Sequence, residues 1–93
     1  MTLTSNNEVL HVKILSPRKD FFNGQAVSVS SINSAGKFDI LPEHGNMITL
    51  INNSPIIIKG LNKQIITFAF PLAIIYVKKN QVTIFTDIHL EKL

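Results

Sequence analysis

The segment Leu10-His11-Val12-Lys13-Ile14 alternates apolar and polar side chains without a break. Successive side chains of a β-strand point to opposite faces, so this alternation places three apolar side chains on one face of a strand. Pro17 then ends the strand, because proline cannot donate to a ladder. Residues 27–30 and 38–40 repeat the period of two. The chain is therefore predicted to be built from β-strands.

Local signals predict turns and one irregularity between these strands. Asn23-Gly24 is a typical turn dipeptide, and residues 33–36 predict a second turn. The alternation slips at Ser30-Ser31 before Ile32, which predicts a β-bulge. Residues 42–46 begin with a proline and are predicted to form a rigid loop.

The second half of the chain is apolar on both faces of its predicted strands. A strand that is covered on both sides has a continuous apolar run, whereas a solvated antiparallel strand alternates. Turn residues separate the runs at intervals of about ten residues, and no helical pattern precedes Asp87. This spacing predicts an all-β fold, a β-sandwich or barrel. The runs lie at residues 56–58, 65–66, 73–77 and 82–85.

Length and composition limit the fold classes further. The 93 residues suffice for a single domain, predicted as a β-sandwich over residues 8–87 with tails at 1–7 and 88–93. A 45% hydrophobic content excludes a disordered segment, and the absence of cysteine excludes a disulfide scaffold. The longest uncharged stretches, 44–58 and 64–77, fall short of the ~20 apolar residues of a membrane-spanning helix. Because the N-terminus is polar, we also expect no signal peptide.

The net charge of +3 raises the question of nucleic-acid binding. The nine basic residues are spread along the whole chain, and eight of them are lysine. Proteins that read grooves or phosphates rely on the planar fork of arginine. We therefore expect these lysines to be solvated surface residues, and we predict no nucleic-acid partner.

The doubly apolar strands have a consequence for binding. Four apolar residues, Ile57, Ile65, Ile74 and Phe85, are opposite in phase to the apolar neighbours in their own strands. If one set fills the core, the other set points outward. Exposed apolar patches of several hundred Å² usually mark a partner surface. The sequence therefore predicts a protein-binding face.

Catalytic and metal-binding signals are weak. The three histidines, at positions 11, 44 and 89, have no partner at metal-ligand spacing, and cysteine ligands are absent. His44 follows Pro42 in the rigid loop, where a structural or interface hydrogen bond is the favoured role. The sequence contains no phosphate-binding glycine loop and no nucleophile elbow. We predict a non-catalytic protein with no cofactor and no metal.

Five segments together resemble a known family. Leu10–Pro17, Phe22-x-Gly24, Val27-x-Val29, Gly36–His44 and Val77–Asp87 are similar to the N-terminal β-sandwich domain of the epsilon subunit of F-type ATP synthase. The resemblance covers residues 10–87, and its specific part is Gly-x-Phe-x-Ile-Leu-Pro-x-His at residues 36–44. Phe38 and Ile40 are expected to anchor this segment to the core.

The resemblance implies a flattened sandwich of about ten short, mostly antiparallel strands. It implies a non-catalytic subunit of the central stalk that couples the gamma subunit to the membrane c-ring. The implied location is peripheral, at the cytoplasmic face of the bacterial inner membrane. The surface toward gamma would include Ser16, His44 and Thr49. The loop toward the ring would consist of Ser34, Ala35, Gly36, Lys37 and Phe38.

Three departures from the family pattern carry expectations of their own. Lys37 stands where the family frequently has an acidic residue. Either the ring carries a compensating acidic residue, or the contact between this loop and the ring does not depend on charge. Pro71-Leu72-Ala73 replaces a Ser-Gly-Gly segment, so the local packing there is expected to differ. The family usually continues into two C-terminal helices that brake ATP hydrolysis. A chain that ends at Leu93 is expected to lack that brake, whether by nature or by truncation.

Two other function classes stay open from the residues alone. A stand-alone β-sandwich could hold a small apolar ligand in a cavity lined by Ile and Phe. A small nucleic-acid-binding barrel is the third reading.

Overall fold

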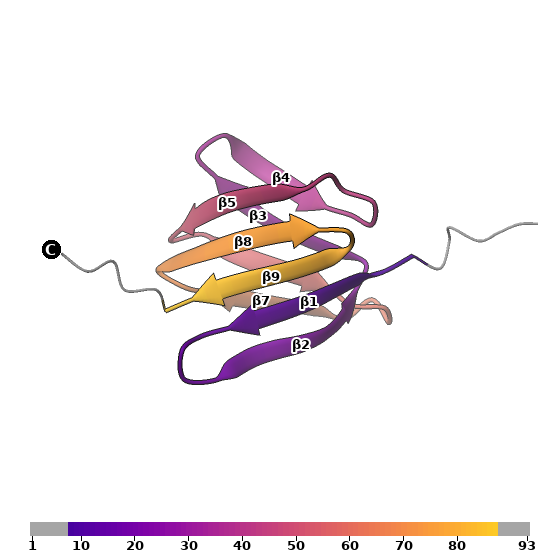
Figure 1. Cartoon of the computed structure of the whole chain (residues 1–93), viewed down its shortest axis with the longest axis horizontal. Coiled ribbons are helices and arrows are strands. Elements are labelled where there is room, and N and C mark those ends of the chain that lie inside the picture. The colour runs from indigo at the N-terminus through magenta and orange to yellow at the C-terminus, as the bar shows by residue number, and fades with distance from the viewer. Residues whose placement is uncertain (1–7, 88–93) are drawn as a thin grey trace, which may run out of the picture.

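The computed structural model describes residues 8–87, and these form nine β-strands and no helix (Figure 1). The strands are β1 (Leu10–Leu15), β2 (Asp20–Ala26), β3 (Ser28–Asn33), β4 (Gly36–Ile40), β5 (Met47–Asn52), β6 (Pro55–Lys59), β7 (Ile65–Ala69), β8 (Leu72–Lys78) and β9 (Gln81–Thr86). The predicted all-β class is confirmed. The two predicted tails, residues 1–7 and 88–93, lie outside the described residues.

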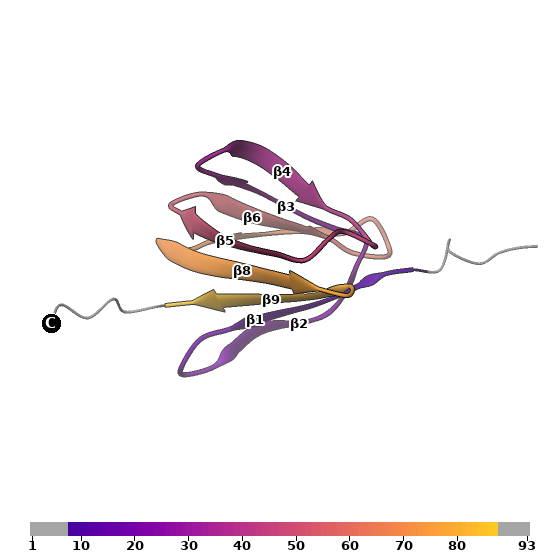
Figure 2. The same cartoon turned by 45° about the horizontal axis from the view of Figure 1, so that its top comes forward.

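The strands form two sheets that face each other as a sandwich (Figure 2). The five-stranded sheet has the order β2-β1-β9-β8-β5, and the four-stranded sheet has the order β4-β3-β6-β7. Neighbours pair antiparallel except β1 and β9, which are parallel. Strands from the two ends of the chain therefore lie side by side in the middle of one sheet.

The core consists of the inward-facing apolar residues of both sheets. The inward phase is the one with Ile56, Ile58, Ile75, Val77 and Ile84, all at most 1% exposed. The opposite phase points outward, which decides between the two alternatives that the sequence left open. The full set of buried apolar residues is Leu10, Val12, Ile14, Ala26, Val29, Ile40, Ile51, Ile56, Ile58, Ala73, Ile75, Val77, Val82 and Ile84.

The predicted turn at Asn23-Gly24 is wrong, because both residues lie inside β2. The turn comes earlier, at residues 16–19, where the Ser16 hydroxyl donates to the Lys19 carbonyl at 2.9 Å and accepts the Lys19 N–H at 3.1 Å. Gly24 serves a different purpose from a turn. A Cβ at this position would lie 3.3 Å from the Phe22 ring, so the absent side chain makes room for that ring.

The predicted β-bulge at Ser30-Ser31 is also wrong. The β3–β4 register is continuous from Val29 to Asn33. The pattern slips because the polar Ser31 occupies an inward position and is 5% exposed. Pairing of β3 with β6 ends at Ser30, and the Ser31 hydroxyl then donates to the Pro55 carbonyl at 2.8 Å. A side chain thus replaces a backbone donor where the two strands separate.

The structure has its register shift elsewhere, between β1 and β2. Ile14 pairs with Phe22 and Leu15 with Asp20, so Phe21 is an extra residue in β2. A bulge re-aims the side chains beside it. Here both Phe21 and Phe22 pack against the core instead of alternating.

The two long sides of the sandwich are closed in different ways. On one side β3 approaches β5, and the Asn33 amide donates to the Thr49 hydroxyl at 2.9 Å. On the other side aromatic rings fill the space between β2 and β7. Phe21 meets Phe70 edge-on at 5.3 Å between centroids, and Phe22 meets Phe68 in the same way at 6.2 Å.

The turns gather at two ends of the sandwich. The Ser16 end, at the left of Figure 1, holds the turns at residues 16–19, 34–35, 53–54 and 70–71. The His44 end, at the right, holds the loop at 41–46 and the turns at 60–64 and 79–80. The predicted turn at 33–36 and the predicted loop at 42–46 are confirmed.

Candidate partner-binding surfaces

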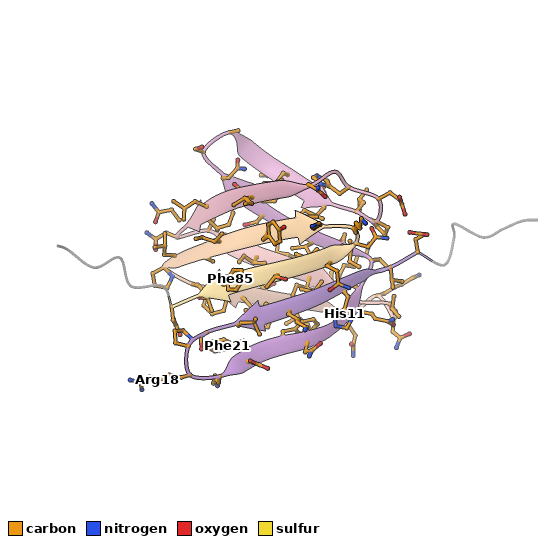
Figure 3. The ribbon with its side chains drawn as sticks, in the orientation of Figure 1. His11, Arg18, Phe21 and Phe85 are labelled. Carbon is orange, nitrogen blue, oxygen red and sulfur yellow. The ribbon has the colours of Figure 1, made fainter. Side chains whose placement is uncertain are left out.

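The outer face of the five-stranded sheet carries a row of apolar side chains that crosses four strands. Leu50 of β5 pairs with Ile74 of β8, Ile74 pairs with Phe85 of β9, and Phe85 pairs with Leu15 of β1. Leu50 is 52% exposed and Phe85 is 43% exposed, while Ile74 and Leu15 are half-buried. Figure 3 shows Phe85 on this face. We call these four residues the apolar row.

A second row lies beside the apolar row, toward the His44 end. Ile48 pairs with Tyr76, Tyr76 with Thr83, and Thr83 with Lys13. Ile48 is 71% exposed, the highest value among the large apolar residues that the structure describes. The third row is polar, with His11 opposite Gln81. The face thus changes from apolar to polar along the strand direction.

The outer face of the four-stranded sheet is mixed. Its central row joins Asp39, Ser30, Ile57 and Thr67 across all four strands. The Ser30 hydroxyl donates to the Asp39 carboxylate. Exposed Lys37 and Lys59 add charge on either side of this row, and Ile65 lies beside Lys59 in register.

The predicted protein-binding face is therefore divided between two surfaces. All four predicted residues point outward, but Ile57 and Ile65 belong to the four-stranded sheet, whereas Ile74 and Phe85 belong to the five-stranded sheet. Only the second pair lies in a continuous apolar row. Three further residues of this face were not predicted from the sequence: Leu15, Leu50 and Ile48. The apolar residues at every position of 47–51 except Thr49 were the available signal.

Ser16, His44 and Thr49 lie at three separate places. Ser16 follows β1, and His44 precedes β5, which runs parallel to β1, so the two residues are at opposite ends of the five-stranded sheet (Figure 1). His44 is half-buried, and its Nδ1 lies 2.7 Å from the Gly45 carbonyl oxygen. Thr49 points inward and bonds to Asn33. The apolar row and the Ile48 row lie between Ser16 and His44.

The segment from Ser34 to Phe38 forms the β3–β4 hairpin at the Ser16 end. Ser34, Ala35 and Lys37 are exposed, and the Ala35 N–H donates to the Asn33 side chain at 2.9 Å. Gly36 has a φ of 120°, which glycine adopts without strain. Phe38 packs against the core, so the tip of the hairpin is held from its base.

A carboxyl pair occupies the His44 end. The Asn80 side chain donates to the Glu8 carboxylate at 2.8 Å and accepts the Glu43 backbone N–H at 2.7 Å. A hydrogen bond from Glu43 lowers the pKa of Glu8, and the bond to Asn80 lowers it further. The same shared hydrogen bond and the charge of Glu8 raise the pKa of Glu43. The pair therefore favours a state in which one proton is shared.

Residues 8–87 contain neither a cluster of candidate metal ligands nor a helix that could cross a membrane. No group of three or more His, Asp or Glu side chains in this part of the chain is placed to hold a metal ion. Over the same residues no helix is long and apolar enough to span a bilayer.

Comparison with known proteins gives one consistent result. Residues 9–91 match the model of the family described as ATP synthase, Delta/Epsilon chain, beta-sandwich domain. The ATP synthase epsilon chain of Sulfurimonas denitrificans is 28% identical over 78 residues, which cover 84% of this chain and 60% of that one. The epsilon chain of Xanthomonas oryzae pv. oryzae is 30% identical over 74 residues, which cover 80% of this chain and 53% of that one. This chain thus spans little more than half the length of these relatives.

Two solved structures share the fold at low sequence identity. A chain in the cryo-EM structure of the Euglena gracilis mitochondrial ATP synthase, OSCP/F1/c-ring, matches with a TM-score of 0.78 at 9% identity. The match covers 85% of this chain and 51% of that chain. A chain of the Tetrahymena thermophila mitochondrial ATP synthase central stalk and c-ring matches with a TM-score of 0.69 at 13% identity, over 83% of this chain and 62% of that one.

Proposed function

The chain belongs to the ATP synthase Delta/Epsilon chain beta-sandwich domain family, and from that premise we propose that it is a non-catalytic subunit of the central stalk of an ATP synthase. In this role it couples the gamma subunit to the c-ring and performs no chemistry itself. The relatives named ATP synthase epsilon chain support this proposal.

The observation that carries the proposal is the apolar row on the five-stranded sheet. Four apolar side chains in register across four strands would face water in the isolated chain. Phe85 and Tyr76, 43% and 37% exposed, are large aromatic side chains of the kind that anchors protein interfaces. We assign this face to gamma. Its position between Ser16 and His44 allows a partner that lies along the face to reach both residues.

The second contact of the proposed role involves the β3–β4 hairpin. We propose that residues 34–38 face the ring, because this hairpin has an exposed tip and a base that packs against the core. Lys37 is exposed on this hairpin, so its charge can reach a partner. An acidic group on the ring is the complement that this lysine fits.

The location follows from the proposed partners. A stalk subunit bound to a membrane ring is peripheral to the membrane, and we place it at the cytoplasmic face of a bacterial inner membrane. The chain then reaches the membrane only through the complex.

The alternative of a small apolar ligand needs a cavity between the sheets. The fourteen apolar side chains that would line such a cavity are at most 1% exposed and form one packed cluster. Phe85 and the other residues of the apolar row face away from that cluster. The packing therefore favours a protein partner over an interior ligand.

Co-purification with gamma and the c-ring from native membranes tests the proposal. Ile48→Asp introduces a charge on the face assigned to gamma, and Ile65→Asp introduces the same charge on the outer face of the other sheet. The two isoleucines are 71% and 65% exposed on edge strands, so the variants are well matched. We expect Ile48→Asp to reduce recovery of gamma by about tenfold or more and Ile65→Asp to leave it unchanged. Equal recovery with both variants would contradict the assignment.

A further inference from the structure

Strand β7 is the outer edge of the four-stranded sheet and is uncharged and mostly exposed. Among residues 8–87 it pairs only with β6. Its five residues, Ile65-Ile66-Thr67-Phe68-Ala69, carry no charge, and all except Phe68 are exposed. An exposed edge strand presents unpaired backbone groups to any chain that can extend the sheet.

The hydrogen bonds of β6 show which backbone groups of β7 are free. The Lys59 carbonyl accepts from Val27, and the Pro55 carbonyl accepts from Ser31, so both carbonyls point away from β7 and toward β3. Alternate residues of a strand bond to opposite sides, so Ile56 and Ile58 are the residues that bond to β7.

The partners of Ile56 and Ile58 in register are Phe68 and Ile66. These two β7 residues therefore use their backbone groups inside the sheet. By the same alternation, the N–H and C=O groups of Ile65, Thr67 and Ala69 point outward from the edge. Three donors and three acceptors thus face outward in a row.

The other edge strands differ from β7. Strand β2 carries Asp20 and the bulge at Phe21, and β4 carries Lys37 and Asp39, all of which discourage strand pairing. Strand β5 is uncharged, but β3 approaches it and bonds to Thr49. Strand β7 has neither a charge nor a bulge, and its contact across the seam is made by the rings of Phe22 and Phe68 and not by a hydrogen bond that any described residue donates to its edge.

The two sheets do not end at the same place on this side of the molecule. In Figures 1 and 2 the five-stranded sheet runs beyond β7, so β2 has no strand of the other sheet opposite it. The side chains between these edges are rings, and Phe22 and Phe68 are only half-buried. A strand added beside β7 would lie opposite β2 and bury those rings further.

We propose that β7 is a strand-addition site that binds an extended, uncharged segment of a protein partner. The segment pairs with Ile65, Thr67 and Ala69 through its backbone. Every second residue of the segment is apolar, because that side faces Phe22 and Phe68. The site is separate from the face assigned to gamma and does not depend on the proposed function.

A second copy of the chain is a poorer occupant than a single strand. Two β7 strands pairing antiparallel are related by a two-fold axis perpendicular to the sheet. That operation keeps both five-stranded sheets on the same side, and the protruding β2 of each copy would enter the same space. A lone strand meets no such obstruction.

The test measures backbone amide exchange by NMR in the full 93-residue chain. The probe is a capped peptide with one lysine at each end of the sequence Thr-Ile-Thr-Ile-Thr. In the free chain the amides of Ile65, Thr67 and Ala69 should exchange at least about tenfold faster than those of Ile66 and Phe68. Millimolar peptide should slow the three outward amides about tenfold and leave the other two unchanged.

Two controls separate strand pairing from simple apolar contact. The same peptide with N-methyl groups on the residues that face β7 keeps its side chains but loses the donors on that edge. It should give no protection. Thr67→Pro removes one outward donor without touching the ladder to β6, whereas Thr67→Val keeps the donor. The proline variant should stay folded and lose protection at Ile65 and Ala69, and the valine variant should behave like the original chain.

Three outcomes would overturn the proposal. The first is equal protection by the N-methylated peptide. The second is unchanged protection in a folded Thr67→Pro variant. The third is protection that rises with the concentration of the chain itself in the absence of peptide, which would assign the edge to a second copy.

Discussion

The two outer faces of this sandwich come from strands with similar sequences, yet they differ in kind. On the five-stranded sheet, Leu50, Ile74, Phe85 and Leu15 meet in register and form a continuous apolar row. On the four-stranded sheet, Ile57 lies in a row with Asp39, Ser30 and Thr67. Outward-facing apolar residues of strands that are apolar on both faces thus form a continuous apolar surface on the five-stranded sheet but only part of a mixed surface on the four-stranded sheet. The neighbouring strands in register make the difference.

The largest expected effect is the difference in stability loss between an inward-facing and an outward-facing residue of β9. Ile84 is fully buried, while the next residue, Phe85, is 43% exposed on the outer face. Ile84→Ala should lower the free energy of unfolding by about 3 kcal/mol, because it leaves a cavity in the core. Phe85→Ala should lower it by less than about 1 kcal/mol. Urea denaturation of both variants measures the difference. Similar losses would mean that Phe85 supports the fold more than a partner.

The second effect concerns binding at the apolar row. Phe85→Asp places a carboxylate in the middle of that row and should weaken binding to gamma by about 2 kcal/mol, or about 30-fold. Thr67→Asp places the same group in the central row of the other face and should leave binding to gamma unchanged. Titration of purified gamma with each variant provides the measurement. A comparable loss with Thr67→Asp would remove the functional contrast between the faces.

The third effect is a change in stability at Thr86, on the inner face of the five-stranded sheet. Thr86 is 1% exposed and its hydroxyl has no hydrogen-bond partner among the described residues. Replacing a buried, unpaired hydroxyl with a methyl group of the same shape removes a desolvation cost, so Thr86→Val should stabilise the fold by about 1 kcal/mol. Thr83→Val, on the outer face of the same strand, is the matched control and should change stability by less than about 0.5 kcal/mol. Thermal denaturation distinguishes them, and a destabilised Thr86→Val would reveal an unseen hydrogen bond.

The smallest effect is at the His44 end, outside both faces. The pKa of Glu43 is raised above its ordinary 4.5, so the stabilisation from its protonated form is complete below pH 4.5 and is lost as the pH rises through the raised value. The pKa of Glu8 is lowered, so the stabilisation from its ionised form is present above pH 4.5 and is lost as the pH falls through the lowered value. The pair is therefore most stabilising near pH 4.5.

A Glu43→Gln variant tests this linkage. The amide introduced in this variant can donate to Glu8 at every pH. The melting temperature of the variant should therefore exceed that of the original chain by a small amount that grows between pH 4.5 and pH 7. Parallel thermal melts across this range measure the effect. A constant difference in melting temperature would show that the shared proton contributes nothing to stability.

The local pattern predicted much of the fold but none of its pairings. The alternation at residues 10–14 predicted β1, and the apolar runs at 73–77 and 82–85 predicted β8 and β9 without indicating which phase points inward. The parallel pairing of β1 with β9 joins residues about seventy positions apart, which no local signal specifies. The apolar row depends on this pairing, so the sequence predicted outward apolar residues without predicting the surface that they form.

Two errors show how local signals mislead when the surroundings decide. Asn23-Gly24 has the composition of a turn, but both residues lie in β2, where they pair with β1 and where Gly24 leaves room for the Phe22 ring. The slip at Ser30-Ser31 resembles a bulge, but Ser31 is simply a polar residue in the core that donates to Pro55. In both cases a residue outside the local window fixes the strand: Val12 pairs with Gly24, and Pro55 accepts the hydrogen bond from Ser31.

By itself, the sequence determined that the chain is an all-β fold, which strand positions are apolar, and which family it resembles. These properties depend on short periods and on residue types that can be read within a few positions. Only the tertiary structure decided that Leu15, Phe85, Ile74 and Leu50 share one face, that Ser16 and His44 lie at opposite ends, and that the uncharged β7 lies at a sheet edge. Those properties depend on strand order and register, which are set by the packing of both sheets around a common core.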